Sequence, residues 1–80
     1  MKELLEHLDR LHTTEQGAVR LRRNPALPGV DPVAWCRRQI AAPDAAAVRR
    51  GKNWYITVGG AVITVNAHSY TIITAHRAPG

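Results

Sequence analysis

The 80-residue chain predicts an α+β fold, with two or three N-terminal helices packed on one face of a C-terminal antiparallel meander of three or four strands. Apolar residues recur at spacings of three and four in the first half, and they alternate at every second position from Trp54 onward. Proline and glycine clusters separate the segments. We expect a single domain over residues 1–80, with a helical half at 1–44 and a sheet half at 45–80.

The helical half begins with an amphipathic pattern over residues 3–12. Its apolar positions share one stripe of a helix: Leu4, Leu8 and Leu11. Thr13 with Gln16 three positions later has the pattern of a capping box, which predicts a second short helix that ends before Asn24.

A stretch that holds two prolines and a glycine, residues 24–30, predicts a connection rather than a helix or strand. Asp31 followed by Pro32 predicts the start of a third helix that continues to about Ala42. Aspartate caps a helix N-terminus, and proline fits the first helical position.

The sheet half shows a period of two. The alternating segments predict three strands: residues 54–58, 61–65 and 70–76. Gly59-Gly60 predicts a two-residue hairpin turn between the first two strands. Residues 44–50 fit either a helical turn or an edge strand, and the strands that follow favour the strand.

Charge is distributed unevenly along the chain. Residues 45–80 contain four Lys or Arg and no Asp or Glu, so they carry four of the five net positive charges. A basic surface without carboxylates is typical of proteins that bind a polyanion. The sheet face that the helices leave uncovered, with its alternating Thr, Tyr and His, is therefore expected to meet an anionic partner.

The lone cysteine, Cys36, cannot form an internal disulfide, and this composition favours a cytoplasmic protein. No segment approaches the roughly 20 apolar residues of a membrane span. The charged N-terminus is unlike a secretory leader, and no amphipathic anchor accompanies the basic charge, so we expect no membrane partner. A domain of this size builds only a small core, which leaves homodimerisation as an alternative.

Histidines provide candidates for acid–base chemistry, because an unperturbed imidazole titrates at about pH 6.5. His76 lies at a strand end and His68 in a turn, although both positions also suit plain surface histidines. A spacing of two residues is expected to place His76 on the same strand face as Tyr70 and Thr74. Lys52 fits either a phosphate contact or a solvated basic turn.

Candidates for nucleic-acid contacts are basic or aromatic residues of the sheet half: Arg49, Arg50, Lys52, Tyr55 and Arg77. Tyr55 and Tyr70 are both candidates for stacking on unpaired bases. Trp35 and Trp54 suit the core better, because the chain has few other large side chains to bury.

The remaining histidines fit structural roles. His7 is expected on the surface of the first helix, and His12 suits capping of the second helix or, alternatively, contact with the sheet. The chain has no C-x-x-C pair and no phosphate-binding glycine loop or nucleophile elbow. We therefore predict no metal and no cofactor.

Three sequence blocks carry a resemblance to a known family: residues 11–17, 51–55 and 63–76. They resemble a small family of bacterial proteins described as a domain of unknown function. The resemblance spans nearly the whole chain and implies no particular activity.

The predicted architecture is also similar to the metal-independent ribonuclease group that includes barnase, the EndoU nucleases, tRNA-cleaving colicins and RelE-type toxins. The ending Ile73-Thr74-Ala75-His76 is similar to strand endings in some of those toxins. This resemblance implies a small RNA-directed endoribonuclease that needs no metal. An antitoxin-like protein partner would be in keeping with it.

In such a mechanism one imidazole deprotonates the RNA 2′-OH and a second acid protonates the leaving 5′-oxygen, with His76 and His68 as the pair. Lys52 or Arg50 would stabilise the phosphorane. The hydroxyl groups of Thr74 and Tyr70 would orient the phosphate. The alternatives are a non-catalytic module that binds RNA, DNA or an acidic protein, and an accessory subunit whose Thr/Tyr face forms a dimer or heteromer interface.

Overall fold

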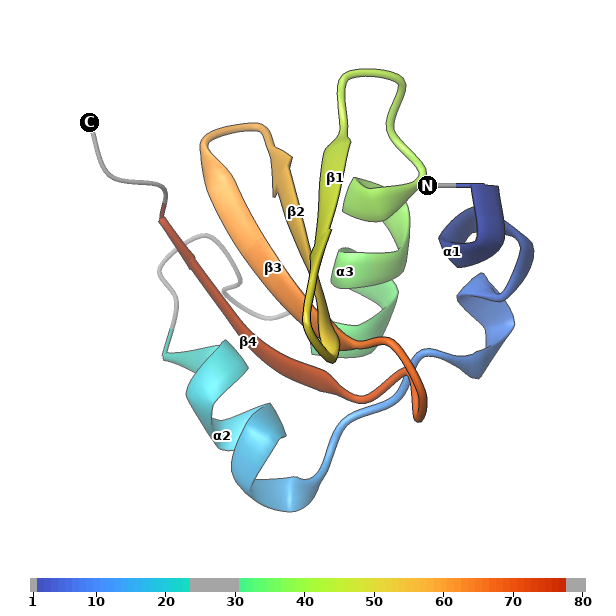
Figure 1. Ribbon diagram of the computed structural model, residues 1–80. Helices are drawn as coiled ribbons and strands as arrows, with labels where there is room; N and C mark the ends of the chain where they lie inside the picture. The colour runs from blue at the N-terminus through green and yellow to red at the C-terminus, as the bar shows by residue number, and fades with distance from the viewer. Residues whose placement is uncertain (1, 24–30, 78–80) are drawn as a thin grey trace.

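The computed structural model describes residues 2–23 and 31–77, and it confirms the predicted α+β fold (Figure 1). The helical elements are α1 (Lys2–Glu6), the short 3-10 helix η1 (Leu8–Arg10), α2 (Glu15–Arg22) and α3 (Pro32–Ile40). The strands are β1 (Ala46–Arg50), β2 (Asn53–Val58), β3 (Ala61–Asn66) and β4 (Ile72–Arg77). The four strands pair antiparallel in the order β1-β2-β3-β4, so each strand neighbours the next one along the chain. The predicted connection at 24–30 lies outside the described residues.

The predicted continuous helix over 3–12 is wrong, because the chain leaves the helical conformation at His7. At this residue φ is −122° and ψ is 27°, and the short helix η1 follows. The break allows Leu4 and Leu11 both to be buried in the core. It also places the half-buried His7 ring edge-on against Tyr70, with the ring centroids 5.6 Å apart.

The cap of α2 lies one residue later than predicted. The Thr14 hydroxyl oxygen accepts a hydrogen bond from the Gly17 N–H at 3.0 Å, so Thr14 is the N-cap. Thr13 is engaged elsewhere, because its hydroxyl donates to the carbonyl oxygen of Ile72 at 3.0 Å. Gly17 is needed here, since a Cβ at this position would collide with the Thr13 hydroxyl.

Helix α3 begins as predicted. The Asp31 carboxylate accepts from the N–H groups of Val33 and Ala34 at 2.9 and 3.4 Å, and Pro32 occupies the first turn. The helix ends at Ile40, slightly before the expected end. The segment that was compatible with a helical turn or a strand forms the edge strand β1.

The hairpin between β2 and β3 is confirmed. Gly59 and Gly60 both have positive φ, 54° and 78°, as a type I′ turn requires. The last strand differs from the prediction, because β4 begins only at Ile72. A register shift lies between Thr64 and Val65 of β3, where Ile72 pairs with Val65 and the next pairing joins Thr74 to Thr64.

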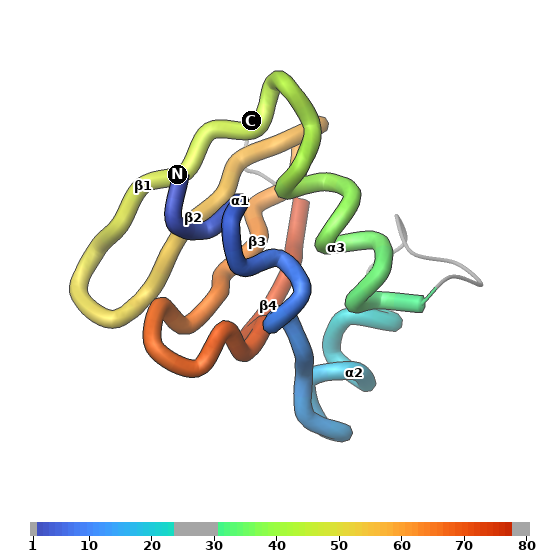
Figure 2. The backbone as a smooth tube through the Cα atoms, turned by 90° about the vertical axis from the view of Figure 1, so that its right-hand side faces the viewer, coloured from blue at the N-terminus to red at the C-terminus, as the bar shows by residue number. Residues whose placement is uncertain are grey.

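The core lies between the sheet and the helices. Helices α2 and α3 lie on one side of the sheet, as the view in Figure 2 shows. Alternate strand residues are buried against them, with Trp54 only 8 % exposed, while the half-buried Trp35 packs against the same core. The largest fully buried side chains come from both halves of the chain: Leu4, Leu21, Cys36, Ile40, Ile56, Ile63, Val65 and Ile72. None of the described helices lies on the other face of the sheet.

Candidate nucleic-acid interface

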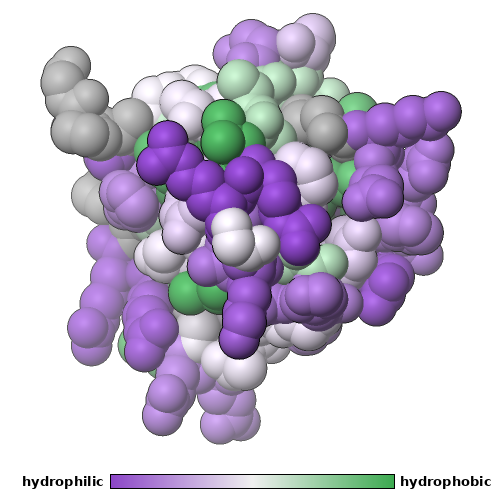
Figure 3. Space-filling model, in the orientation of Figure 1, coloured by the Kyte–Doolittle hydropathy of each residue, from purple (hydrophilic) through white to green (hydrophobic). Residues whose placement is uncertain are grey.

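The strand register defines which side chains occupy the uncovered face of the sheet, called here the open face. Residues that pair directly across antiparallel strands share a face, and successive residues alternate between faces. Figure 3 views the molecule from this side and shows hydrophilic side chains gathered over the middle of the sheet, with apolar atoms between them. The open face carries Val48, Arg50, Tyr55, Thr57, Val62, Thr64, Thr74 and His76.

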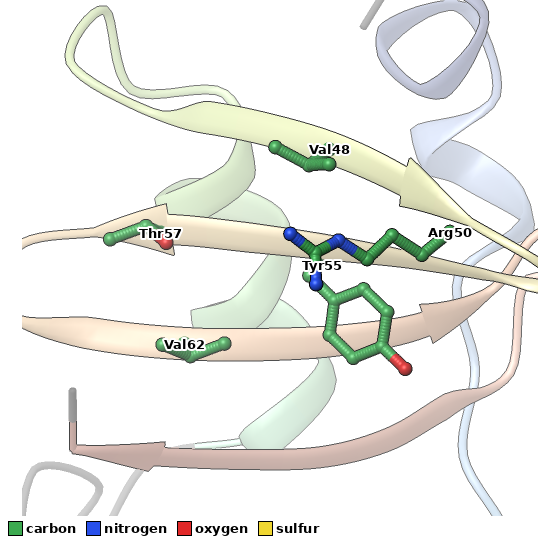
Figure 4. A pocket seen from close by; sticks show the side chains of 5 residues that line it. All are labelled: Val48, Arg50, Tyr55, Thr57 and Val62. Atoms are coloured by element: carbon green, nitrogen blue, oxygen red, sulfur yellow. The ribbon is translucent and has the colours of Figure 1, made fainter. Parts of the chain in front are cut away.

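A shallow depression of about 720 Å³ lies on the open face, lined by residues of β1, β2 and β3 (Figure 4). Its lining residues are Val48, Arg50, Tyr55, Thr57 and Val62. Tyr55 and Val48 remain 37 % and 52 % exposed. Figure 4 shows the Arg50 guanidinium reaching from β1 over β2 toward the Tyr55 ring, which extends toward β3. The depression therefore combines a cation, an aromatic ring and two apolar borders.

The strand pleat separates the predicted binding arginines. Arg50 pairs with Asn53 on the open face, whereas Arg49 pairs with Trp54 on the opposite face. The Arg49 guanidinium lies 5.9 Å from the Trp54 ring centroid, and its Nε donates to the Gly51 carbonyl oxygen at 3.0 Å. Arg77 pairs with Ala61 and so also belongs to the helix-covered side, although it is exposed at the end of β4.

The expectation that Tyr70 shares a strand face with His76 is wrong. Tyr70 lies in the turn before β4, has a φ of 60° and is only 6 % exposed. Its ring is enclosed by His7 and by the Arg10 guanidinium, which is 4.6 Å from the ring centroid. Because the ring is buried against these groups, Tyr70 does not provide a stacking surface on the open face.

His68 and His76 lie at opposite ends of β4. His68 is in the turn that precedes the strand, and His76 pairs with Val62 near its far end. The stretch from Ile72 to His76 alone spans roughly 13 Å, at about 3.3 Å per residue. Thr74 lies on the open face near His76, opposite Thr64. The two imidazoles therefore do not converge on one position where a single phosphate could lie.

Polar side chains that are distant in sequence lie together at the end of the sheet that carries the β3–β4 turn. The Thr71 hydroxyl oxygen lies 2.7 Å from Ser69 Oγ and 3.1 Å from His12 Nε2. We call these three side chains the hydroxyl–imidazole cluster. His12 was expected to favour capping of α2, but its backbone pairs with Thr71 in a parallel bridge, so it takes the alternative position beside the sheet. Nothing in the local sequence signals this contact, since the two residues are 59 positions apart.

Two basic residues lie at the same end of the sheet. The Arg10 Nη2 donates to the His68 carbonyl oxygen at 3.5 Å, which holds the guanidinium beside the β3–β4 turn. Lys52, exposed in the β1–β2 turn, lies next to the same turn because its carbonyl oxygen accepts from the Ala67 N–H at 2.8 Å. The predicted residues Lys52 and His68 are therefore neighbours at this end of the sheet.

The potential metal ligands and the Cys36 thiol can be placed within the described residues. Within residues 2–23 and 31–77, no group of three or more His, Cys, Asp or Glu is placed to hold a metal ion. Burial raises the pKa of the Cys36 thiol to about 12, which keeps it protonated and unreactive near neutral pH. Over the same residues, no helix is both long enough and apolar enough to cross a bilayer.

The chain belongs to the family described as "Protein of unknown function (DUF3781)", whose model matches residues 5–76. The expected membership in a family without an assigned activity is thereby confirmed. No curated protein matches the chain, and no solved structure does. The resemblance to metal-independent ribonucleases stays a prediction.

Proposed function

We propose that this member of the DUF3781 family binds single-stranded RNA along the open face of its sheet. One observation carries the proposal: Arg50 and Tyr55 lie side by side in an uncovered depression, in a half of the chain that contains no carboxylate side chain. A cation beside an exposed aromatic ring is the combination that holds a phosphate and an unpaired base together.

Each part of the depression has a role in such binding. Tyr55 stacks on a base, a contact worth about 1–3 kcal/mol in single-strand binding proteins. Arg50 neutralises an adjacent phosphate, and its planar guanidinium offers several donors to the phosphate oxygens. Val48 and Val62 also line the depression and offer apolar surface to the stacked base.

The geometry supports binding better than cleavage. A metal-independent cleavage needs a base and an acid on opposite sides of one phosphate. The predicted pair, His68 and His76, is separated by the length of β4. Within the described strands, the open face thus offers contacts to the RNA backbone and bases, and His68 lies too far from His76 to act with it on one phosphate.

The proposal is tested by fluorescence anisotropy with labelled single-stranded RNA of about 16 nucleotides, the upper end of the site sizes of small single-strand binding modules. Tyr55→Ala is expected to raise the dissociation constant by about tenfold, and Arg50→Gln by a similar or smaller factor. Arg50→Gln should also lower the slope of log affinity against log salt by about 0.7, the value for one phosphate contact to a single strand.

Arg49→Gln is the matched control, because Arg49 has the same charge one residue away on the opposite face. Its affinity should stay within about a factor of three of the wild type, since only the general field changes. Equal losses in the Arg49 and Arg50 variants would contradict the proposed face. Absence of wild-type binding at concentrations of about 100 μM, the weak limit of nonspecific binding, would contradict the function itself.

Cleavage is examined in the same samples. Purified protein incubated with total RNA in EDTA is expected to leave the RNA intact. Degradation that is lost in His76→Ala would contradict the preference for binding and restore the catalytic prediction for that histidine.

A further inference from the structure

We propose that the hydroxyl–imidazole cluster is a separate binding site for a phosphate monoester. The proposal goes beyond RNA binding by the open face and does not depend on it. The cluster joins two parts of the chain that are distant in sequence: His12 before α2, and Ser69 with Thr71 in the segment between β3 and β4.

The cluster offers convergent donors. Thr71 Oγ1 lies between Ser69 Oγ and His12 Nε2, so two hydroxyls and one imidazole nitrogen stand in a row. Each hydroxyl can turn its proton from its present partner toward a ligand, and Nε2 donates only when both ring nitrogens carry a proton. A phosphate monoester has three terminal oxygens and a charge of about −1.5 to −2 near neutral pH, so it offers an acceptor to each hydroxyl and to the doubly protonated imidazole. His12 and Ser69 are exposed and Thr71 is half-buried, which leaves the row open to a ligand.

The imidazole is oriented toward this row. His12 Nδ1 lies 2.9 Å from the Arg10 carbonyl oxygen. A carbonyl oxygen only accepts, so Nδ1 carries a proton and Nε2 faces Thr71. When His12 binds a second proton, Nε2 becomes a charged donor to an anion at the same position.

The framework of the site is already built. Asn66 Oδ1 accepts from the N–H groups of His68 and Ser69 at 2.9 and 3.0 Å. The backbone of His12 is held on both sides, since its N–H donates to the Tyr70 carbonyl and its carbonyl accepts from the Ile72 N–H. A site ordered before binding loses less entropy when its ligand arrives.

The same hydrogen bonds favour binding over catalysis at this cluster. The N–H groups of successive turn residues all donate within the turn: His68, Ser69, Tyr70 and Thr71. None of these four is free to stabilise an oxyanion, so a nucleophilic role for Thr71 lacks its usual partner. Arg10, whose guanidinium lies beside the same turn, instead adds positive charge near the cluster.

The first experiment titrates the protein with inorganic phosphate and follows its backbone and imidazole NMR signals. We expect shifts at His12, Ser69 and Thr71. Thr71→Val keeps the shape of the side chain and removes one hydrogen bond to a charged ligand, so the dissociation constant should rise about tenfold. His12→Gln should weaken binding by a similar factor, and an unchanged signal dispersion would show that both variants remain folded.

Thr74→Val is the matched control, because Thr74 is also a half-buried threonine but lies within β4, where it pairs with Thr64 away from the cluster. Its phosphate affinity should equal that of the wild type. Equal affinities in the Thr71 and Thr74 variants, or phosphate shifts confined to other residues, would overturn the proposal.

The second experiment identifies the source of the phosphate. Single-stranded RNA with a 5′-phosphate is compared with the same RNA bearing a 5′-hydroxyl, and with a nucleoside 5′-monophosphate. Tighter binding of the phosphorylated RNA by about tenfold, lost in Thr71→Val, would identify an RNA end as the ligand. Binding of the mononucleotide with no preference between the RNAs would identify a small phosphorylated molecule.

Failure of the two proposals can be told apart. RNA affinity that depends on Tyr55 but shows no response of the cluster to phosphate would retain the open face and remove the monoester site. Phosphate-induced NMR shifts at the cluster in a protein that binds neither RNA would retain the monoester site and remove the RNA-binding open face.

Discussion

The two faces of the sheet are built from the same strands but have different surroundings. On the face covered by the helices, Ile56 and Ile63 are 0 % exposed, whereas on the open face Val48 and Tyr55 are 52 % and 37 % exposed. Helices α2 and α3 lie on one side of the sheet and cover that face. Stability therefore depends mainly on the covered face, and the open face is available for a ligand.

The largest effect is expected from a truncation on the covered face. Ile63→Ala should lower the free energy of unfolding by about 2–5 kcal/mol, because it removes buried methyl groups and leaves a cavity. Val48→Ala is the counterpart on the open face and should cost no more than about 0.5 kcal/mol. Urea denaturation of both variants measures the difference, and equal losses would break the distinction between the faces.

The pH dependence of stability tests how well the helices exclude water. The Cys36 thiol ionises at an ordinary 9.0 in the unfolded chain, and burial raises its pKa to about 12 in the folded protein. Between these values the unfolded state binds fewer protons, so the free energy of unfolding should fall by about 1.4 kcal/mol per pH unit as pH rises. Below about pH 8 the thiol is protonated in both states, so it no longer makes the free energy of unfolding depend on pH.

Cys36→Ala isolates that contribution from other groups that titrate in the same range. The variant should lose stability less steeply than the wild type above about pH 9 in parallel urea titrations. Identical slopes would mean that water reaches the thiol beneath α3.

A smaller effect is expected at the start of α3, the helix that covers β2. Asp31→Ala should lower the free energy of unfolding by about 1 kcal/mol, because the N–H groups of Val33 and Ala34 lose their acceptor. Asp31→Asn keeps a capping oxygen and should cost less. Thermal or urea unfolding of the two variants distinguishes the cap from the general effect of removing a charge.

The smallest stability effect is expected on the open face at Tyr55. Tyr55→Ala should cost about 0.2–1 kcal/mol, the range for cross-strand pairs, because the ring is partly exposed and has Val48 and Thr64 as its cross-strand neighbours. The same variant is expected to weaken RNA binding by about tenfold. If the Tyr55→Ala variant were unfolded, the open face would have to contribute to the stability of the core.

The sheet half was largely predictable because its signals are local. Alternation identified β2 and β3, and Gly59-Gly60 identified their turn. The site was less predictable. The two-residue spacing predicted that Tyr70 and His76 share a face, but the register shift between β3 and β4 breaks that alternation. Between Val65 and Thr64, β3 advances one residue while β4 advances two, and the extra residue reverses the phase of the side chains.

The amino-acid sequence by itself determined the kinds of element, the hairpin turn, the Asp31 cap and the location of most of the net positive charge in a half without carboxylates. These features follow from periodicity and composition, which act over a few residues. Tertiary structure alone decided that Arg50 rather than Arg49 shares a face with Tyr55, that Tyr70 is buried, and that His12 meets Thr71. Strand register and contacts between distant segments set these positions, and both depend on how the whole chain packs.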